Sequence, residues 1–83
     1  MSHWNYRVLA VSNKTYPDEI SLEFYEVYYN DEGVPDGYTA NPVGVGSDTM
    51  KGLGWVLNRM KEALKKPVLW EGKRFPEEYI PKV

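Results

Sequence analysis

The sequence of 83 residues contains no cysteine and only one histidine, His3. The missing thiols exclude disulfide bonds, thiolate metal ligands and cysteine nucleophiles, and this composition is typical of a reducing compartment. One imidazole cannot supply the convergent His, Cys or carboxylate ligands that a metal site needs. We therefore expect neither a metal ion nor a cofactor.

Long apolar runs are also missing. No stretch approaches the roughly 20 apolar residues that a membrane-spanning helix needs, and the N-terminal "MSHWNYRV" lacks the basic start and apolar core of a signal peptide. We expect one small domain, residues 1–83, in the cytoplasm and away from membranes. A domain of this size has a marginal core, which favours reinforcement by a partner.

Catalytic and nucleotide-binding patterns are lacking as well. Residues 44–47 form a glycine-rich joint between a predicted strand and a predicted helix, but Thr49 stands where G-x-G-x-x-G requires its third glycine. No parallel βαβ unit fits into the chain, and its serines have no candidate base partner. The sequence therefore predicts a protein that is not an enzyme.

Charge is segregated along the chain. Residues 15–50 contain eight acidic side chains and no Lys or Arg, whereas residues 51–66 carry five bases and one acid, Glu62. The net charge of −2 hides this asymmetry. Segregation of this kind bears on partners and association rather than on fold.

Three segments, residues 4–12, 20–30 and 34–43, have the aromatic and β-branched composition of strands. Between the second and the third, Asp31-Glu32-Gly33 fits a three-residue hairpin turn that ends on a left-handed glycine. Pro35 and Pro42 mark the third segment as an edge strand, because proline cannot donate to a ladder. We predict an antiparallel meander with the second segment in its centre.

One amphipathic helix is predicted at residues 48–66. Ser47 or Asp48 is its predicted N-cap, and Pro67 ends it. A short fourth strand or extended segment at residues 68–72 and a C-terminal tail at 72–83 follow. The apolar side chains of the helix recur at intervals of 3, 4, 3 and 4, the spacing of one helix face: Met50, Leu53, Leu57, Met60 and Leu64.

The predicted fold class is α+β, a three-stranded antiparallel β-meander with the amphipathic helix packed on one face and a short C-terminal strand or extended segment. Within residues 20–30 the apolar alternation changes parity at Glu26. Either a bulge lies near Tyr25, or the sheet is aromatic on both faces. The predicted core is drawn from the strands and the helix stripe: Val8, Ile20, Leu22, Phe24, Leu53, Leu57, Met60 and Leu64.

Trp55 breaks the pattern of the helix. It lies about 200° around the helix from Leu53, opposite the predicted buried stripe. Tryptophan is a favoured anchor at protein interfaces, although the tail or a stacked cation would also cover the ring. The candidate interaction surface is this face of the helix: Lys51, Trp55, Asn58, Arg59, Glu62, Lys65 and Lys66.

Four blocks occur in order between Trp4 and Leu69: W-N-Y-R, Y-E-V-Y-Y, T-x-N-P-V and A-L-K-K-P-V-L. They resemble a group of small bacterial proteins of about this length that has no assigned activity, and the resemblance implies a βββα-type fold and a bacterial cytoplasmic setting. A looser similarity to HicB-like antitoxin domains rests on the order of three strands, a helix and a strand. The glycine-rich early hairpin and the appended DNA-binding segment of that family are missing here.

Two classes of function stay open. The first is a small protein-interaction or regulatory domain that binds another protein or itself, with the basic helix face of one copy against the acidic strands of another. The second is a nucleic-acid-binding or antitoxin-like module that uses the basic helix face around Trp55. A net charge of −2 argues against the second, because such domains normally carry a basic excess. A steep loss of binding with salt would favour nucleic acid, and salt-tolerant association would favour protein.

Overall fold

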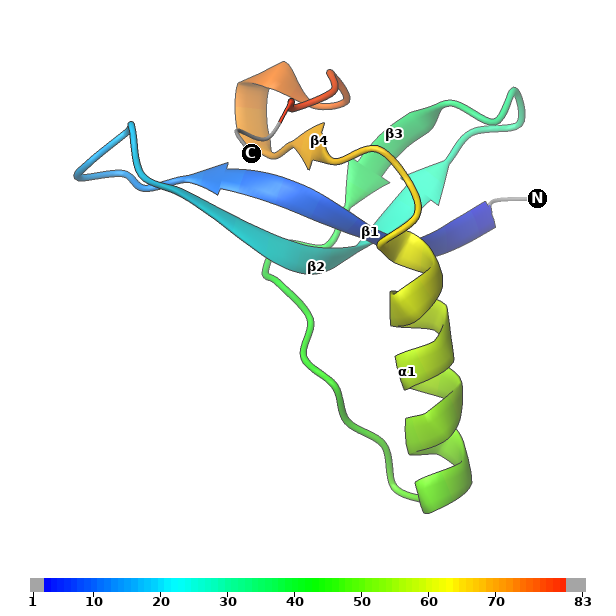
Figure 1. The fold of residues 1–83 in the computed structure, drawn as a ribbon. Helices are drawn as coiled ribbons and strands as arrows, with labels where there is room; N and C mark the ends of the chain where they lie inside the picture. The colour runs from blue at the N-terminus through cyan, green and yellow to red at the C-terminus, as the bar shows by residue number, and fades with distance from the viewer. Residues whose placement is uncertain (1–2, 81–83) are drawn as a thin grey trace.

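A computed structural model describes residues 3–80, which form a four-stranded sheet and one projecting helix (Figure 1). The predicted α+β class is confirmed, while residues 81–83, the end of the predicted tail, lie outside the described residues. The strands are β1 (His3–Ser12), β2 (Ile20–Tyr29), β3 (Pro35–Tyr38) and β4 (Leu69–Trp70). Helix α1 spans Met50–Ala63, and the 3-10 helix η1 spans Gly72–Arg74.

The strand order is β3-β2-β1-β4, so β2 lies between β1 and β3 as predicted. The prediction of an antiparallel sheet of three strands was wrong in one respect. After α1 the chain returns to the free edge of β1, where Leu69 of β4 lies opposite Leu9 in a parallel pair. Parallel pairing needs a long crossover, which the helix and its connections provide.

The predicted third strand, residues 34–43, was too long, because only Pro35–Tyr38 forms β3. Residues 39–49 form an irregular arm that keeps two backbone hydrogen bonds to β2, with Thr39 N at 3.0 Å from Glu26 O and Val43 N at 2.8 Å from Phe24 O. The arm then runs away from the sheet to the start of α1 (Figure 1). The predicted turn before β3 is confirmed, since Gly33 adopts a φ of 78°.

The change of parity in β2 reflects a sheet that is covered on both faces. β1 and β2 keep an unbroken antiparallel register from the His3–Tyr29 pair to the Ser12–Ile20 pair, so no bulge interrupts them. On one face Tyr6 packs with Met60 and Ala63 of α1. On the other face the core combines strand residues with the C-terminal segment: Leu9, Tyr25, Val27 and Leu69, with Tyr38 and Phe75 against them.

Arg7 of β1 is the one buried charged residue among those described. Its Nη1 donates to the hydroxyl of Tyr29 at 2.8 Å, and its Nη2 donates to the carbonyl of Pro67 at 2.7 Å. The side chain therefore connects β1, β2 and the segment that follows α1.

Helix α1 is shorter than predicted at both ends. Thr49 caps it, accepting a hydrogen bond from Gly52 N at 2.9 Å, so neither Ser47 nor Asp48 is the N-cap. The cap position at its end is Leu64, before Pro67. Only the C-terminal half of the helix reaches the sheet, through Val56, Met60 and Ala63.

The predicted core was therefore only partly right. Of its eight residues, Val8 and Met60 are buried, Ile20, Phe24 and Leu53 are partly buried, and Leu22, Leu57 and Leu64 are exposed. The reason is geometric: the apolar stripe of α1 is wider than its contact with the sheet. The helix projects from the sheet instead of lying across it, so one edge of the stripe packs and the other stays open (Figure 1).

Candidate functional site

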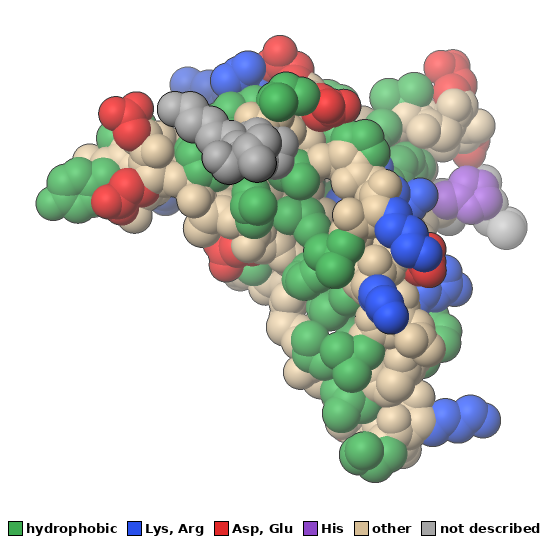
Figure 2. Space-filling view, viewed as in Figure 1, with side chains coloured by type: hydrophobic (Ala, Val, Ile, Leu, Met, Phe, Trp, Pro, Cys, Tyr) green, Lys and Arg blue, Asp and Glu red, His purple; other side chains and the backbone are tan. Residues whose placement is uncertain are grey.

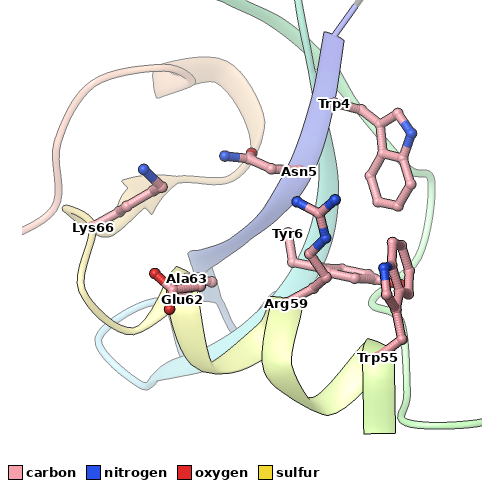
Figure 3. A pocket seen from close by; sticks show the side chains of 8 residues that line it. All are labelled: Trp4, Asn5, Tyr6, Trp55, Arg59, Glu62, Ala63 and Lys66. Atoms are coloured by element: carbon pink, nitrogen blue, oxygen red, sulfur yellow. The ribbon is translucent and has the colours of Figure 1, made fainter. Parts of the chain in front are cut away.

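A groove of about 430 Å³ lies between the first half of β1 and the C-terminal half of α1 (Figure 3). We call it the tryptophan groove, because it has an indole ring from each element. It is lined by Trp4, Asn5, Tyr6, Trp55, Arg59, Glu62, Ala63 and Lys66.

The strand contributes an ordered aromatic pair to the tryptophan groove. Trp4 and Tyr6 are two residues apart on β1, so their side chains point to the same face of the sheet. Their rings meet edge to face, with centroids 5.3 Å apart. Tyr6 is buried against α1 while Trp4 is exposed at the rim.

The helix contributes a stacked cation. Trp55 and Arg59 are four residues apart and share one flank of α1. The guanidinium carbon of Arg59 lies 5.0 Å from the centroid of the Trp55 ring, which is cation–π geometry. Trp55 nevertheless keeps 47% of its surface exposed. The ring therefore lies off the part of α1 that packs on the sheet, and a cation stacks on it, which is one of the alternatives that the sequence left open. It faces Trp4 across the groove (Figure 3).

The groove carries uncompensated positive charge. Among residues 3–80 neither Arg59 nor Lys66 forms an ion pair, and Glu62 bonds instead to Lys65, with Nζ and Oε1 3.3 Å apart. Burial raises the pKa of the Tyr6 hydroxyl, the Glu26 carboxylate adds to this, and Arg59 opposes it. Tyr6 therefore stays a neutral hydrogen-bonding group at physiological pH.

The structure divides the predicted surface into two parts. Trp55, Arg59, Glu62 and Lys66 line the groove, whereas Lys51, Asn58 and Lys65 are exposed elsewhere on the helix and its end. Sequence reasoning missed the strand half of the site. The shared parity of Trp4 and Tyr6 was a usable signal, but the sequence does not say which end of β1 the helix crosses.

Residues 3–80 contain neither a metal-binding cluster nor a membrane-spanning helix. No group of three or more His, Asp or Glu side chains is placed to hold a metal ion. No helix in the described part of the chain has the length and apolarity to cross a membrane.

Comparison with known proteins adds no relative: no family model, no curated protein and no solved structure matches the chain. The two resemblances of the sequence blocks therefore stay predictions. The geometry and charge of the molecule are therefore the basis for its proposed function.

Proposed function

We propose that this chain is a small protein-interaction domain that binds an acidic segment of another protein in the tryptophan groove. One observation carries the proposal. Two exposed indoles, Trp4 and Trp55, share the groove with two cations that have no carboxylate partner within residues 3–80. Arg59 stacks on Trp55, and Lys66 lies at the other side of the groove (Figure 3). The cytoplasmic setting predicted from the sequence is part of the same proposal.

The residue types suit an interface hot spot. Trp, Tyr and Arg dominate the energetically important positions of protein interfaces, because they bury a large area at a low entropic cost. Stacking on Trp55 restricts the Arg59 side chain before a ligand arrives. Its guanidinium can then donate two parallel hydrogen bonds to a carboxylate.

We therefore expect a ligand that has both an acidic group and an apolar group. A carboxylate would pair with Arg59 or Lys66, and an apolar or aromatic side chain would pack between Trp4 and Trp55. The eight acidic side chains of residues 15–50 would not compete, because none of them lines the groove.

Nucleic acid is the alternative ligand for stacked aromatic rings and cations. The net charge of −2 argues against it, because nucleic-acid-binding domains normally carry a basic excess. We therefore favour protein and treat nucleic acid as an outcome of the test.

The test is a selection from a displayed random peptide library on the wild-type chain, with counter-selection on Trp55→Ala. We expect enriched peptides that contain acidic residues together with an aromatic or aliphatic residue. Trp55→Ala should weaken their binding at least about tenfold, near 1.4 kcal/mol, while changing the free energy of unfolding by less than about 0.5 kcal/mol. Asn58→Ala, on the same helix outside the groove, is the matched control.

Two results would contradict the proposal. Peptides that bind the wild type and Trp55→Ala equally would move the site away from the groove. Binding of a labelled single-stranded oligonucleotide that is lost steeply with salt and depends on Trp55 would identify the second class of ligand instead.

A further inference from the structure

The flank of α1 opposite the tryptophan groove is apolar and uncovered. Met50 is 83% exposed, Leu57 is 51% exposed and Leu64 is 66% exposed, and Leu53 between them is partly buried. We call these four residues the helix stripe. Figure 2 shows apolar side chains running along the projecting helix, with Lys and Arg side chains beside them.

An isolated helix of this kind is not expected to be stable in water. Helices shorter than about 12–15 residues are marginal without tertiary packing, and α1 has 14 residues. Its Gly52 and Gly54 each cost roughly 1 kcal/mol relative to alanine. Since only the flank of Val56, Met60 and Ala63 packs on the sheet, a cover over the helix stripe would stabilise the projecting half.

The spacing of the stripe identifies the kind of cover. Met50, Leu57 and Leu64 recur every seven residues and Leu53 follows Met50 by three, which is the spacing of a coiled-coil seam, in which side chains of one helix pack into gaps on another. Met60, the remaining position of that pattern, packs on the sheet of its own copy. We propose that two copies of this chain form a dimer through an antiparallel pair of α1 helices, with the two-fold axis beside Leu57. Leu57 then faces Leu57 of the second copy, and Met50 faces its Leu64.

Charge complementarity selects the second copy and the antiparallel direction. In this register Asp48, at the start of one helix, lies at the level of the basic end of the other, where Lys65 follows α1. The antiparallel helix dipoles also attract each other. A parallel pair would instead place the basic ends, including Lys61, side by side.

The close approach of two helices also has a steric basis. Gly54 borders the stripe, and a β-carbon built on it would meet no atom within 4 Å in the single chain. In the proposed pair Gly54 lies at the edge of the contact between the two helices, where its missing side chain lets the two backbones come together. This inference uses no residue of the tryptophan groove, so the two proposals stand or fall separately.

Cysteine cross-linking tests the register, because the chain has no cysteine of its own. A disulfide forms only when the two Cα atoms come within about 7 Å. We expect Leu57→Cys to form a covalent dimer under mild oxidation at least about tenfold faster than Asn58→Cys, its matched control on the adjacent flank. Equal rates would overturn the inference.

The direction of the pair is tested with two further variants. Leu64→Cys alone should not cross-link, because the two Leu64 residues would lie about 21 Å apart along antiparallel helices. A mixture of Met50→Cys and Leu64→Cys should give the mixed dimer. Efficient cross-linking of Leu64→Cys to itself would overturn the antiparallel arrangement.

Analytical ultracentrifugation tests the association itself. The wild type should sediment as a concentration-dependent dimer, and Leu57→Glu should weaken that dimer at least about tenfold, whereas Asn58→Glu and Trp55→Ala should leave it unchanged. Circular dichroism should show that Leu57→Glu keeps the strands, since Leu57 is half exposed in the single chain. A wild type that stays monomeric up to about 1 mM, or that forms species larger than a dimer, would overturn the inference. Groove binding that survives Leu57→Glu would leave the proposed function intact in that case.

Discussion

Strand β1 and helix α1 differ sharply in how far their surroundings enclose them. Five consecutive residues of β1, 6–10, are buried, because the strand has a neighbour on each edge and cover on each face. In α1 only Met60 and Ala63 are buried. The same chain therefore contains a strand that its neighbours enclose on all sides and a helix with two flanks exposed to solvent.

This difference separates stability from recognition. The sheet buries its core under the C-terminal segment, and the hydrogen bonds of Arg7 connect the two. The helix adds a small contact to that core but exposes more apolar surface than packing in the single chain explains. The predictions that follow test this division.

The largest contrast is expected from one chemical change made at two places. Leu9→Ala removes a side chain that is 0% exposed and should cost about 2–5 kcal/mol of the free energy of unfolding. Leu57→Ala, which the sequence placed in the core, should cost less than about 1 kcal/mol at concentrations where the chain is monomeric. Urea denaturation measures both values. Equal losses would mean that the helix stripe packs inside the single chain in solution.

A second large effect is expected at Arg7. Arg7→Ala removes the donors to the Tyr29 hydroxyl and the Pro67 carbonyl, and hydrogen bonds to charged groups contribute about 1.5–3 kcal/mol. We expect a loss of about 2–3 kcal/mol in denaturant unfolding. Arg74→Ala is the control at an exposed position, where the arginine pairs with Glu77 and stacks on Trp70, and it should cost about 1 kcal/mol or less.

Arg7→Met separates the hydrogen bonds from the burial of charge. Methionine is an apolar side chain of similar length, so Arg7→Met keeps much of the packing of Arg7 while it removes the charge and both donors. A stable Arg7→Met variant together with an unstable Arg7→Ala variant would show that packing, rather than the two hydrogen bonds, is what Arg7 contributes.

Much of the sheet was predictable from local patterns. β2 was expected at residues 20–30 and spans Ile20–Tyr29, and the turn before β3 follows from the glycine at position 33. Alternation along β2 left two explanations open for its change of parity, a bulge or apolar side chains on both faces, and the structure shows the second. These features depend on near neighbours in the sequence, which a pattern records directly.

The packing of the helix was not predictable in the same way. Periodicity located the apolar stripe but could not say which edge of it meets the sheet, because that depends on where Tyr6 and the helix end come together. The pairing of β4 with β1 and the place of Trp4 in the groove are long-range outcomes of the same kind. The groove was therefore predicted only on its helix side, through Trp55, Arg59, Glu62 and Lys66.

A smaller effect is expected from the glycines of α1. Gly54→Ala should raise the free energy of unfolding of the monomer by up to about 1 kcal/mol, since its added methyl group meets no atom within 4 Å. Gly52→Ala should not show this gain, because the new methyl group would overlap the Ser47 hydroxyl and crowd the capping hydroxyl of Thr49. Denaturation at low concentration measures the gain, and sedimentation at high concentration should show weaker dimerisation for Gly54→Ala. A Gly54→Ala variant with a tighter dimer would argue against close helix contact at that position.

The smallest expected effect is a dependence of stability on alkaline pH, which originates in the sheet and not in the helix. Burial raises the pKa of the Tyr25 hydroxyl, and the Glu71 and Glu23 carboxylates and Tyr38 raise it further. A tyrosine in the unfolded chain titrates near about 10, so between that value and the higher folded pKa the folded state binds the proton more tightly. The contribution of Tyr25 is therefore complete below pH about 10 and is lost as the pH rises through the folded pKa.

Tyr25→Phe isolates that contribution. Its free energy of unfolding should fall less between pH 8 and pH 11 than that of the wild type, because no hydroxyl remains to ionise in the core. Tyr16→Phe, on the exposed loop between β1 and β2, should keep the pH dependence of the wild type. Urea denaturation of the three proteins across this range gives the comparison, and lysine deprotonation cancels because all three share the same lysines. If Tyr25→Phe kept the full alkaline loss of stability, that loss would originate outside the Tyr25 side of the core.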